Sequence, residues 1–178
     1  MIHNLRRAVA LSIVLIVLCL VYTYVETGVA QVFFRHQADG SLTAYGSTEI
    51  GQAWTGPKWF QGRDDSYTPQ ASGPTNYGPR SEQLYEQVQK QIATLRKEGI
   101  EPTNGLVTGS GSGLDPYISP DDAYAQASAV AKANDLPVSE VDSLIAKNVA
   151  PTYFGIFGSP YVNVLDLNVA LSKITGQT

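Results

Sequence analysis

Hydrophobic residues are unevenly distributed along the chain, and the longest uninterrupted run lies near its N-terminus. Residues 8–25 are eighteen positions without a charged side chain. At a rise of 1.5 Å per residue, this run forms a helix of about 27 Å, close to the roughly 30 Å hydrocarbon thickness of a bilayer. The apolar pattern resumes from Val29 to Phe34, which is expected to finish the helix at the lipid headgroups. The pattern predicts one transmembrane helix over residues 8–28.

The charges that flank this helix predict its orientation. Arg6 and Arg7 precede the apolar run, and no basic residue follows it until Arg35. The side of a membrane helix that carries the excess of Lys and Arg usually faces the cytoplasm. We therefore expect a cytoplasmic N-terminus over residues 1–7 and an extracytoplasmic domain over residues 29–178 of a single-pass protein.

A cleaved signal peptide is the alternative interpretation of the same N-terminal segment. Gly28 and Ala30 place small residues just before Gln31, as a signal peptidase site requires. However, the apolar core of a signal peptide is usually only about 7–15 residues long. The longer run favours an anchor that is retained in the membrane.

The rest of the chain alternates between short apolar pieces and amphipathic helices. Apolar pieces separated by glycine and proline predict short strands or extended loops at 42–45, 49–54, 58–62 and 152–157. Apolar stripes with a helical period predict helices over 81–98, 119–134, from Pro137 onward and over 163–174. Turn-forming residues fill 36–41 and 64–80. These elements predict an α/β fold of the α+β type, in which one soluble domain of short strands packed with helices follows the transmembrane helix.

Two local signals fix the ends of the predicted helices. Ser119 before Pro120 supplies a capping hydroxyl and a proline at the first helical position. The adjacent pair Asp121 and Asp122 then faces the positive end of the helix dipole, which explains both acids structurally. Gly99 is expected to end the helix that starts at residue 81.

Charge and cysteine content exclude several classes of partner. The segment 31–178 holds ten Lys and Arg against fifteen Asp and Glu, a net charge of −5. Mild acidity with interspersed signs argues against nucleic acid and against an anionic lipid surface as partners. The single cysteine, Cys19, lies within the apolar run, so no disulfide can form within the chain and no metal–thiolate site is expected.

The sequence offers little material for catalysis. Histidine occurs only at His3 and His36, and no serine sits in a Gly-x-Ser-x-Gly pattern. The adjacent acids Asp64 and Asp65 are expected to lie in a solvated loop. We predict no catalytic residues and no metal site. The alternative is a membrane-anchored extracytoplasmic binding module or hydrolase, with a pocket lined by the aromatic residues Trp54, Trp59, Phe60 and Tyr67.

The most distinctive local motif is the glycine-rich stretch at residues 108–116. Backbone N–H groups at Gly109, Gly111 and Gly113 could cradle a phosphate, because glycine-rich loops commonly do so. The phosphate-loop pattern also requires Lys-Ser or Lys-Thr after the last glycine, where Leu114 and Asp115 stand instead. An acid there repels phosphate, so a tight structural loop or a partner contact is favoured over a nucleotide site.

Several separated motifs, taken in order, resemble the C subunit of the Kdp-type potassium-transporting P-type ATPase, the KdpC family. The resemblance spans the whole chain, and its motifs are specific because all of them occur in register. They are Gly28–Gln31, His36–Leu42, Ile50–Gln52, Trp59–Arg63, Asn76–Pro79, Gly111–Pro120 and Val162–Leu171. Two departures from the family pattern are Asp64-Asp65, where Pro-Ser is usual, and Tyr117, where His is frequent.

The resemblance implies a non-catalytic accessory subunit of an ATP-driven, high-affinity potassium uptake complex in the prokaryotic cell (inner) membrane. The implied partners are a channel-like potassium-binding subunit, a P-type ATPase subunit that carries the phosphorylated aspartate, and a small stabilising peptide. The family's C subunit is described as a catalytic chaperone that supports assembly and raises the ATP affinity of the ATPase subunit. ATP and potassium therefore belong to the complex, and no cofactor is assigned to this chain.

The shared motifs also suggest which residues contact partner subunits. The candidates are Trp59, Phe60, Arg63, Asn76, Leu114, Asp115, Asn163 and Asn168. A Leu-Ser-x-x-Gln element has been associated with nucleotide contact in the family. The corresponding stretch here, Leu136–Glu140, lacks the Ser at its second position and the Gln at its fifth. Direct ATP binding is accordingly the weaker expectation, and assembly with long-range coupling is the stronger one.

Overall fold

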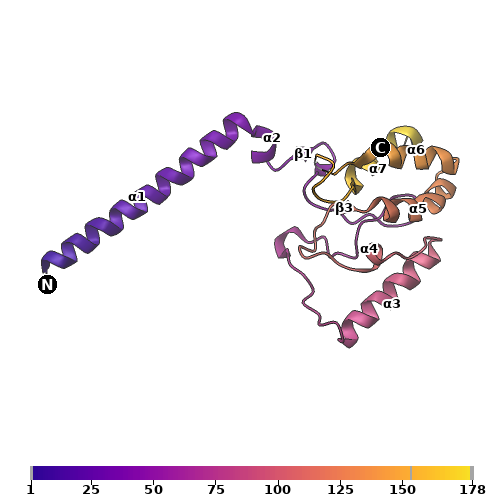
Figure 1. Ribbon diagram of the computed structural model, residues 1–178, viewed down its shortest axis with the longest axis horizontal. Coiled ribbons are helices and arrows are strands. Elements are labelled where there is room, and N and C mark those ends of the chain that lie inside the picture. Colours follow the sequence, from indigo (N-terminus) through magenta and orange to yellow (C-terminus); the bar gives the residue numbers. More distant parts are fainter. Residues whose placement is uncertain (1, 153, 177–178) are drawn as a thin grey trace. The chain divides into compact units, whose positions relative to one another are not determined.

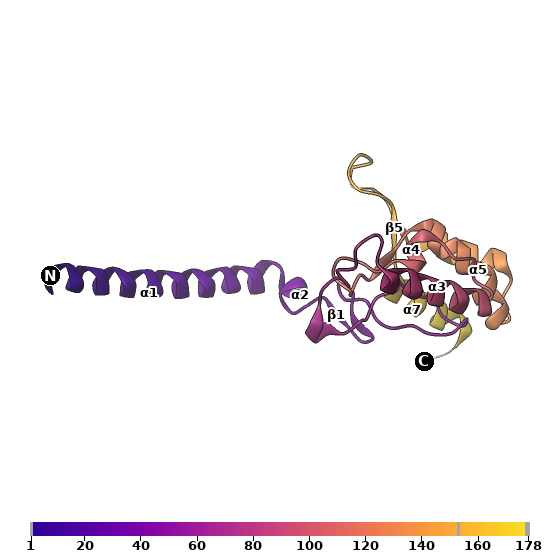
Figure 2. The same ribbon diagram turned by 90° about the horizontal axis from the view of Figure 1, so that it is seen from below.

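A computed structural model describes residues 2–152 and 154–176 of the chain, which divides into two compact units, Met1–Leu42 and Thr43–Thr178 (Figures 1 and 2). The first unit consists of α1 (Ile2–Phe33) and the short α2 (Arg35–Ala38). Helix α1 has 32 residues, which corresponds to about 48 Å. It begins before the predicted transmembrane range 8–28, and its end at Phe33 lies within 29–34, where the helix is expected to finish. The turn predicted over 36–41 is partly wrong, because its first residues belong to α2.

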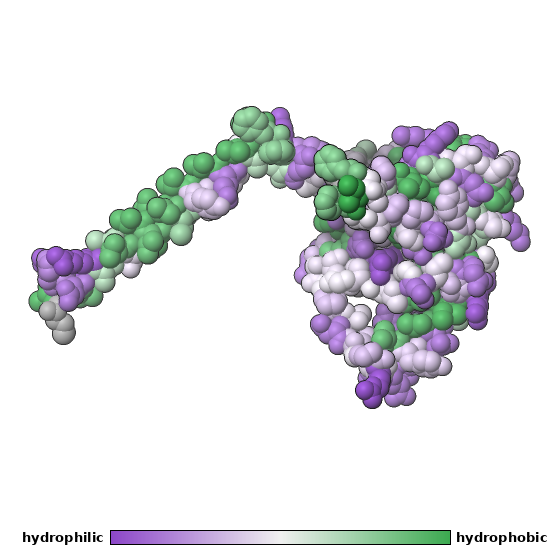
Figure 3. All heavy atoms as spheres, viewed as in Figure 1, coloured by the Kyte–Doolittle hydropathy of each residue, from purple (hydrophilic) through white to green (hydrophobic). Residues whose placement is uncertain are grey.

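Helix α1 is apolar over most of its surface and buries no residue (Figure 3). Its length and composition are sufficient to cross a membrane. The hydroxyl groups of Ser12, Thr23 and Thr27 each donate to the carbonyl oxygen four residues earlier, at 2.8–3.0 Å. These polar side chains are thus satisfied within the helix, as a lipid environment requires.

The described residues of the second unit form five helices, which are combined with short strands. The helices are α3 (Glu82–Lys97), α4 (Asn104–Val107), α5 (Pro120–Ala133), α6 (Val138–Asn148) and α7 (Val164–Thr175). The strands are β1 (Leu42–Thr43), β2 (Gly46–Ser47), β3 (Tyr117–Ile118), β4 (Val149–Ala150) and β5 (Tyr161–Asn163), and Pro69–Ala71 forms a 3₁₀ turn. β1 pairs with β2, and a second sheet has the order β3-β5-β4. This mixture of helices and short strands confirms the predicted fold class.

The core consists of two clusters that meet at α5. The larger cluster packs α5, α6 and α7 against β5, with Phe60 in its midst. The smaller cluster joins the C-terminal part of α3 to α4 through Leu95, Ile100 and Leu106. Ala129 of α5 belongs to the smaller cluster and its neighbour Val130 to the larger one. Two faces of one small-residue helix therefore hold the halves of the domain together.

The predicted helix ends are confirmed in detail. Gly99 adopts φ +78°, and the Gly99 and Ile100 amides donate to the carbonyls of Arg96 and Leu95 at 3.1 and 2.9 Å. These two bonds form a Schellman motif in which Leu95 and Ile100 are both buried. At the start of α5, the Ser119 hydroxyl accepts from the Asp122 amide while the Asp122 carboxylate accepts from the Ser119 amide, which completes a capping box.

Of the four segments predicted as short strands or extended loops, 42–45 contains β1, and the other three contain no strand among their described residues. Residues 49–54 and 58–62 are extended or irregular and join no sheet. Residues 152–157 form the connection between β4 and β5, apart from residue 153, which lies outside the described part of the chain. The apolar run in that connection reflects an exposed turn containing Gly155 at φ +70°, whereas the actual strands flank it.

The segment 58–62 is held by side chains in place of a neighbouring strand. The Asn168 side chain accepts from the Phe60 amide and donates to the Phe60 carbonyl, both at 2.9 Å. The Gln126 side chain likewise accepts from the Gln61 amide at 2.8 Å and donates to the Gln61 carbonyl at 3.1 Å. Both amide side chains are fully buried. Because buried backbone groups need partners, these two residues supply what a strand ladder would otherwise provide.

Candidate functional site

The glycine-rich loop at residues 108–116 is closed by the carboxylate of Asp65. That carboxylate accepts from the Ser110 amide at 2.6 Å, from the Ser110 hydroxyl at 2.7 Å and from the Asp115 amide at 3.1 Å. The Gly113 and Leu114 amides donate to the hydroxyls of Ser110 and Ser112, at 2.9 and 3.1 Å. Of the three glycine amides that could cradle a phosphate, that of Gly113 is therefore already bound to a group of the chain itself, as are the amides of Ser110, Leu114 and Asp115.

The carbonyl groups of the same loop accept hydrogen bonds from three residues that are distant in the sequence. The carbonyl of Ser112 accepts from the Gly73 amide at 2.7 Å, and that of Gly113 accepts from the Tyr67 amide at 3.1 Å. The carbonyl of Leu114 accepts from the Gly51 amide at 2.8 Å. The loop thus organises the long connection 64–80, which contains little regular structure of its own.

Close backbone approach explains two of the loop glycines. Gly113 has φ +67°, and a Cβ atom there would lie 2.8 Å from the Gly73 carbonyl oxygen. A Cβ atom on Gly109 would lie 3.0 Å from the Asp64 carbonyl oxygen. Gly111, in contrast, has open space around it. Two of the three glycines are therefore required by packing within the domain.

Tyr67 and Arg63 lie beside this loop. The Tyr67 hydroxyl donates to the Arg63 carbonyl at 2.9 Å, and burial together with the negative charges of Asp65 and Asp115 raises the pKa of Tyr67 above its usual 10. The Arg63 Nη2 group donates to the Thr108 hydroxyl at 3.3 Å. Within the described residues, the buried Nε atoms of Arg63 and Trp54 have no hydrogen-bond acceptor.

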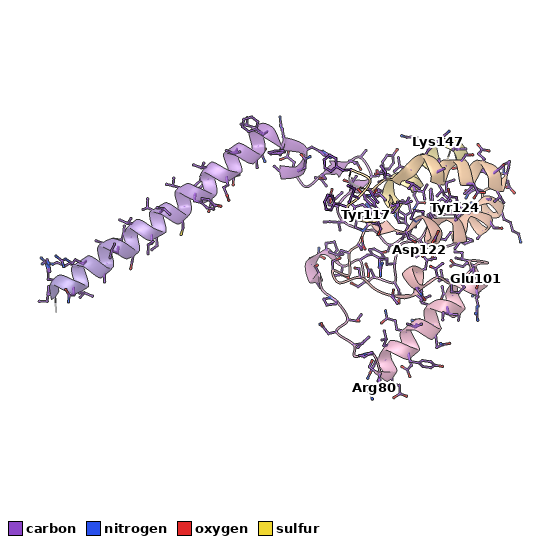
Figure 4. All side chains as sticks on the ribbon, in the orientation of Figure 1. Arg80, Glu101, Tyr117, Asp122, Tyr124 and Lys147 are labelled. Atoms are coloured by element: carbon purple, nitrogen blue, oxygen red, sulfur yellow. The ribbon has the colours of Figure 1, made fainter. Side chains whose placement is uncertain are left out.

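An open cleft of about 610 Å³ borders the loop on the side of β3 and α5. Figure 4 labels Tyr117 and Asp122, which lie on these two elements. The cleft is lined by Arg63 together with Asp115, Asp121, Asp122 and residues of β3 and β5. The Tyr117 and Tyr161 rings pack edge to face, with their centroids 4.7 Å apart. The pKa of Tyr117 is raised, mainly by burial and next by the negative charge of Glu49. Three carboxylates against one guanidinium make this cleft unfavourable for phosphate.

The electrostatics of the loop and the cleft do not suit a nucleotide. The Asp65 carboxylate occupies the position that an anion would take, and Asp115 adds a second negative charge nearby. The loop around Gly109, Gly111 and Gly113 therefore already holds a carboxylate of the chain, which is bound by Ser110 and Asp115. Asp65 lies in a loop and is partly exposed, as expected, but its carboxylate accepts three hydrogen bonds that the sequence does not predict.

The two residue types that a hydrolase would need belong to different units of the chain. His36 belongs to α2 in the unit Met1–Leu42, whereas Ser110 lies in the unit Thr43–Thr178. The Ser110 hydroxyl donates to Asp65 at 2.7 Å, so its proton already has an acceptor that is a weak base. Among the described residues, no group of three or more His, Cys, Asp or Glu is arranged to hold a metal ion.

The eight candidate partner contacts fall into three groups in the structure. Phe60 and Asn168 are fully buried, and they serve the core. Asn163 caps α7 through its side-chain oxygen and donates to the Thr48 carbonyl at 2.8 Å. The remaining candidates reach the surface in part or in full, namely Trp59, Arg63, Asn76, Leu114 and Asp115.

Comparison with known proteins identifies the family. The family model described as "K+-transporting ATPase, c chain" (KdpC) matches residues 5–173. The chain belongs to the KdpC family. A potassium-transporting ATPase KdpC subunit from Caldanaerobacter subterraneus subsp. tengcongensis is 41% identical over 182 residues, which cover 95% of this chain and 94% of the relative.

Two other relatives show a similar extent of similarity. The KdpC subunit 1 of Nostoc sp. is 38% identical, and the aligned region covers 94% of this chain and 95% of the relative. The KdpC subunit of Clostridioides difficile is 38% identical, and the aligned region covers 97% of this chain and 98% of the relative. The similarity therefore includes both α1 and the soluble domain, and the chain is a subunit of a potassium-transporting ATPase complex.

Proposed function

We propose that this KdpC chain is a non-catalytic accessory subunit of the ATP-driven, high-affinity potassium uptake complex. Helix α1 crosses the cell membrane once, with residues 1–7 in the cytoplasm and residues 29–178 outside. The single observation that supports this most strongly is the end-to-end family match, because it includes the apolar helix as well as the domain.

The arrangement of polar groups supports a role without chemistry of its own. The carboxylate of Asp65 and the hydroxyl of Ser110 bind backbone groups and each other, and the buried amides of Gln126 and Asn168 hold the segment 58–62. We assign the phosphorylated aspartate to the P-type ATPase subunit. The partners of this chain are that subunit, the channel-like potassium-binding subunit and the small stabilising peptide.

The chaperone effect on ATP affinity is proposed to act through assembly and not through nucleotide contact by this chain. The glycine-rich loop is filled by Asp65, and the cleft beside it carries three carboxylates. The proposed topology also separates the domain from cytoplasmic ATP. The acidic domain instead suits a position near the extracytoplasmic entrance for potassium, where negative charge raises the local concentration of cations.

The experiment compares the complex purified from cells that contain or lack this chain. We expect that its removal abolishes recovery of the intact complex or its potassium-stimulated ATPase activity, and that the restored wild-type chain recovers both. Photoreactive ATP should label the ATPase subunit and leave this chain unlabelled. Full potassium-stimulated activity without the chain contradicts the accessory role, and saturable labelling of this chain contradicts the indirect mechanism.

The topology is tested by a cysteine at an exposed position of the domain. In a Cys19→Ser background, Tyr85→Cys places one thiol on α3, where the native side chain is 66% exposed. A membrane-impermeant maleimide should label it in intact spheroplasts. Labelling that occurs only after the cells are broken contradicts the proposed orientation.

A further inference from the structure

The connection between β4 and β5 exposes a group of large apolar side chains. Phe154 is 90% exposed, Ile156 is 78% exposed and Phe157 is 66% exposed. In Figure 2 this connection, which precedes β5 in the chain, projects out of the domain. Residues 154–157 are called the hairpin tip below. Soluble surfaces rarely concentrate such side chains on a protrusion without a binding role.

The backbone holds the hairpin tip outward from a fixed root. At the root, Val162 of β5 is fully buried and pairs with Val149 of β4. At the tip, Phe154 and Gly155 adopt φ +52° and +70°, and the Gly155 amide donates to the Thr152 carbonyl at 3.2 Å. A left-handed conformation at a phenylalanine is uncommon and costly. The turn therefore presents its apolar side chains to the surroundings at a cost in backbone strain.

The charge pattern separates the hairpin from the rest of the domain. Lys147 and Asp166 bracket eighteen consecutive uncharged residues, 148–165, although the segment 31–178 carries a net charge of −5. An acidic surface is repelled by anionic lipid, whereas an uncharged aromatic protrusion is compatible with a zwitterionic bilayer surface. The hairpin tip is therefore the part of this domain whose charge best matches a neutral lipid interface.

The size of the apolar patch also points to lipid. An aromatic side chain can bury about 150–250 Å², so the three exposed side chains offer roughly 400 Å². A stable protein interface needs about 800 Å² on each partner. The hairpin tip alone is too small to hold a second protein or a second copy of this chain. Shallow insertion into a bilayer has no such minimum area.

The covalent link to α1 keeps the domain close to the membrane. Nine residues, 34–42, separate the end of α1 from the first residue of the second unit, and they span at most about 30 Å even if fully extended. Because α2 occupies four of these nine positions, the actual reach is shorter. An exposed apolar protrusion on a domain with so short a tether meets the bilayer surface at a high effective concentration.

We propose that the hairpin tip inserts into the outer leaflet at the boundary between the headgroups and the acyl chains of zwitterionic phospholipid. The insertion provides a second membrane contact, which limits rotation of the domain about its tether. This inference rests on the proposed membrane crossing of α1.

The test places an environment-sensitive fluorophore on the hairpin tip of the full chain. In the Cys19→Ser background, Ile156→Cys is labelled with NBD and the chain is reconstituted in phosphatidylcholine nanodiscs, with and without doxyl-labelled lipid. The control label is Tyr85→Cys, on α3, whose native side chain is also exposed. A further variant adds Phe154→Asp and Phe157→Asp to the labelled tip. The same measurements are repeated in the assembled complex.

The proposal predicts a blue-shifted emission at position 156 that doxyl lipid quenches, both in the isolated chain and in the complex. The two aspartates should return this emission to that of a label in water, and position 85 should resemble a label in water throughout. Water-like emission at position 156 overturns the proposal. So does a blue shift that appears only in the complex and resists doxyl lipid, since that result assigns the hairpin tip to a protein partner. A chain that fails to enter nanodiscs refutes the membrane crossing of α1 instead.

Discussion

Asn168→Ala is expected to be among the most destabilising single substitutions in the domain. Asn168 is fully buried, and its side chain binds both the amide and the carbonyl of Phe60 at 2.9 Å. These two bonds hold Phe60 within the larger core cluster although its segment belongs to no sheet. Alanine leaves both backbone groups buried without partners.

The expected loss follows from those two groups. Leaving one buried donor or acceptor unsatisfied costs about 1–3 kcal/mol, so two such groups cost about 2–6 kcal/mol. A loss of about 4 kcal/mol is a large part of the 5–15 kcal/mol typical of a domain. Asn168→Leu removes the same hydrogen bonds while it keeps the volume, so the difference between the two variants measures the cavity left by alanine.

Urea unfolding of the full chain in detergent measures this loss. The only tryptophans, Trp54 and Trp59, pack against the core cluster that contains Phe60, so their fluorescence reports on the segment concerned. With an m-value of about 2 kcal/mol/M, the midpoint should fall by about 2 M. The control is Asn148→Ala, which removes one partly buried bond to the Leu144 carbonyl and should cost at most about 1 kcal/mol. Equal midpoints for the two alanine variants would refute the role assigned to Asn168.

Three further outcomes follow from the same structure. Ser119→Ala removes the hydroxyl that accepts from the Asp122 amide, and it should lower the free energy of unfolding by about 1 kcal/mol in the same urea assay. Gly99→Ala places a Cβ atom at φ +78° and should cost about 1 kcal/mol, whereas the same change at Gly111, which has open space, should cost less. Because the pKa of Tyr67 is raised in the folded chain, its contribution to stability is complete below about pH 10 and declines as pH rises toward the folded pKa. Tyr67→Phe should flatten that decline and remove one late-titrating tyrosine from the ultraviolet absorbance curve, and an unchanged curve would contradict the assignment.

The longer helices α1, α3, α5, α6 and α7 could be predicted because their signals are local, whereas the four-residue helices α2 and α4 were not predicted. The stripe that ends at Leu95, the stop at Gly99 and the start at Ser119 each depend on residues within two turns of one another. The apolar run of α1 is likewise a local property of the sequence. Where the physics of an element is contained in its own residues, the sequence is sufficient to identify it.

Apart from β1, which lies within the predicted segment 42–45, the strands could not be predicted because their pairing is not local. β3 pairs with β5, so Ile118 lies opposite Val162, and neither short segment has a distinctive pattern by itself. The segment 58–62 has the composition of a strand, yet its backbone binds Asn168 and Gln126. A sequence shows that such a backbone needs partners, but it does not show whether a strand or two amide side chains provide them.

The glycine-rich loop shows the same limit at the candidate site and explains why its motif resembles a ligand site. Gly-Ser-Gly-Ser-Gly predicts a backbone that turns its amides toward a negatively charged group, and the structure does supply such a group. That group is the carboxylate of Asp65, 45 residues before Ser110 in the chain. An internal carboxylate and a bound phosphate satisfy the same amides. The motif therefore indicates an anion but not its origin, and here the anion serves to fix the long connection 64–80 to the core. A loop whose ligand is part of the chain needs no nucleotide to be ordered, which is what a subunit that acts through assembly requires.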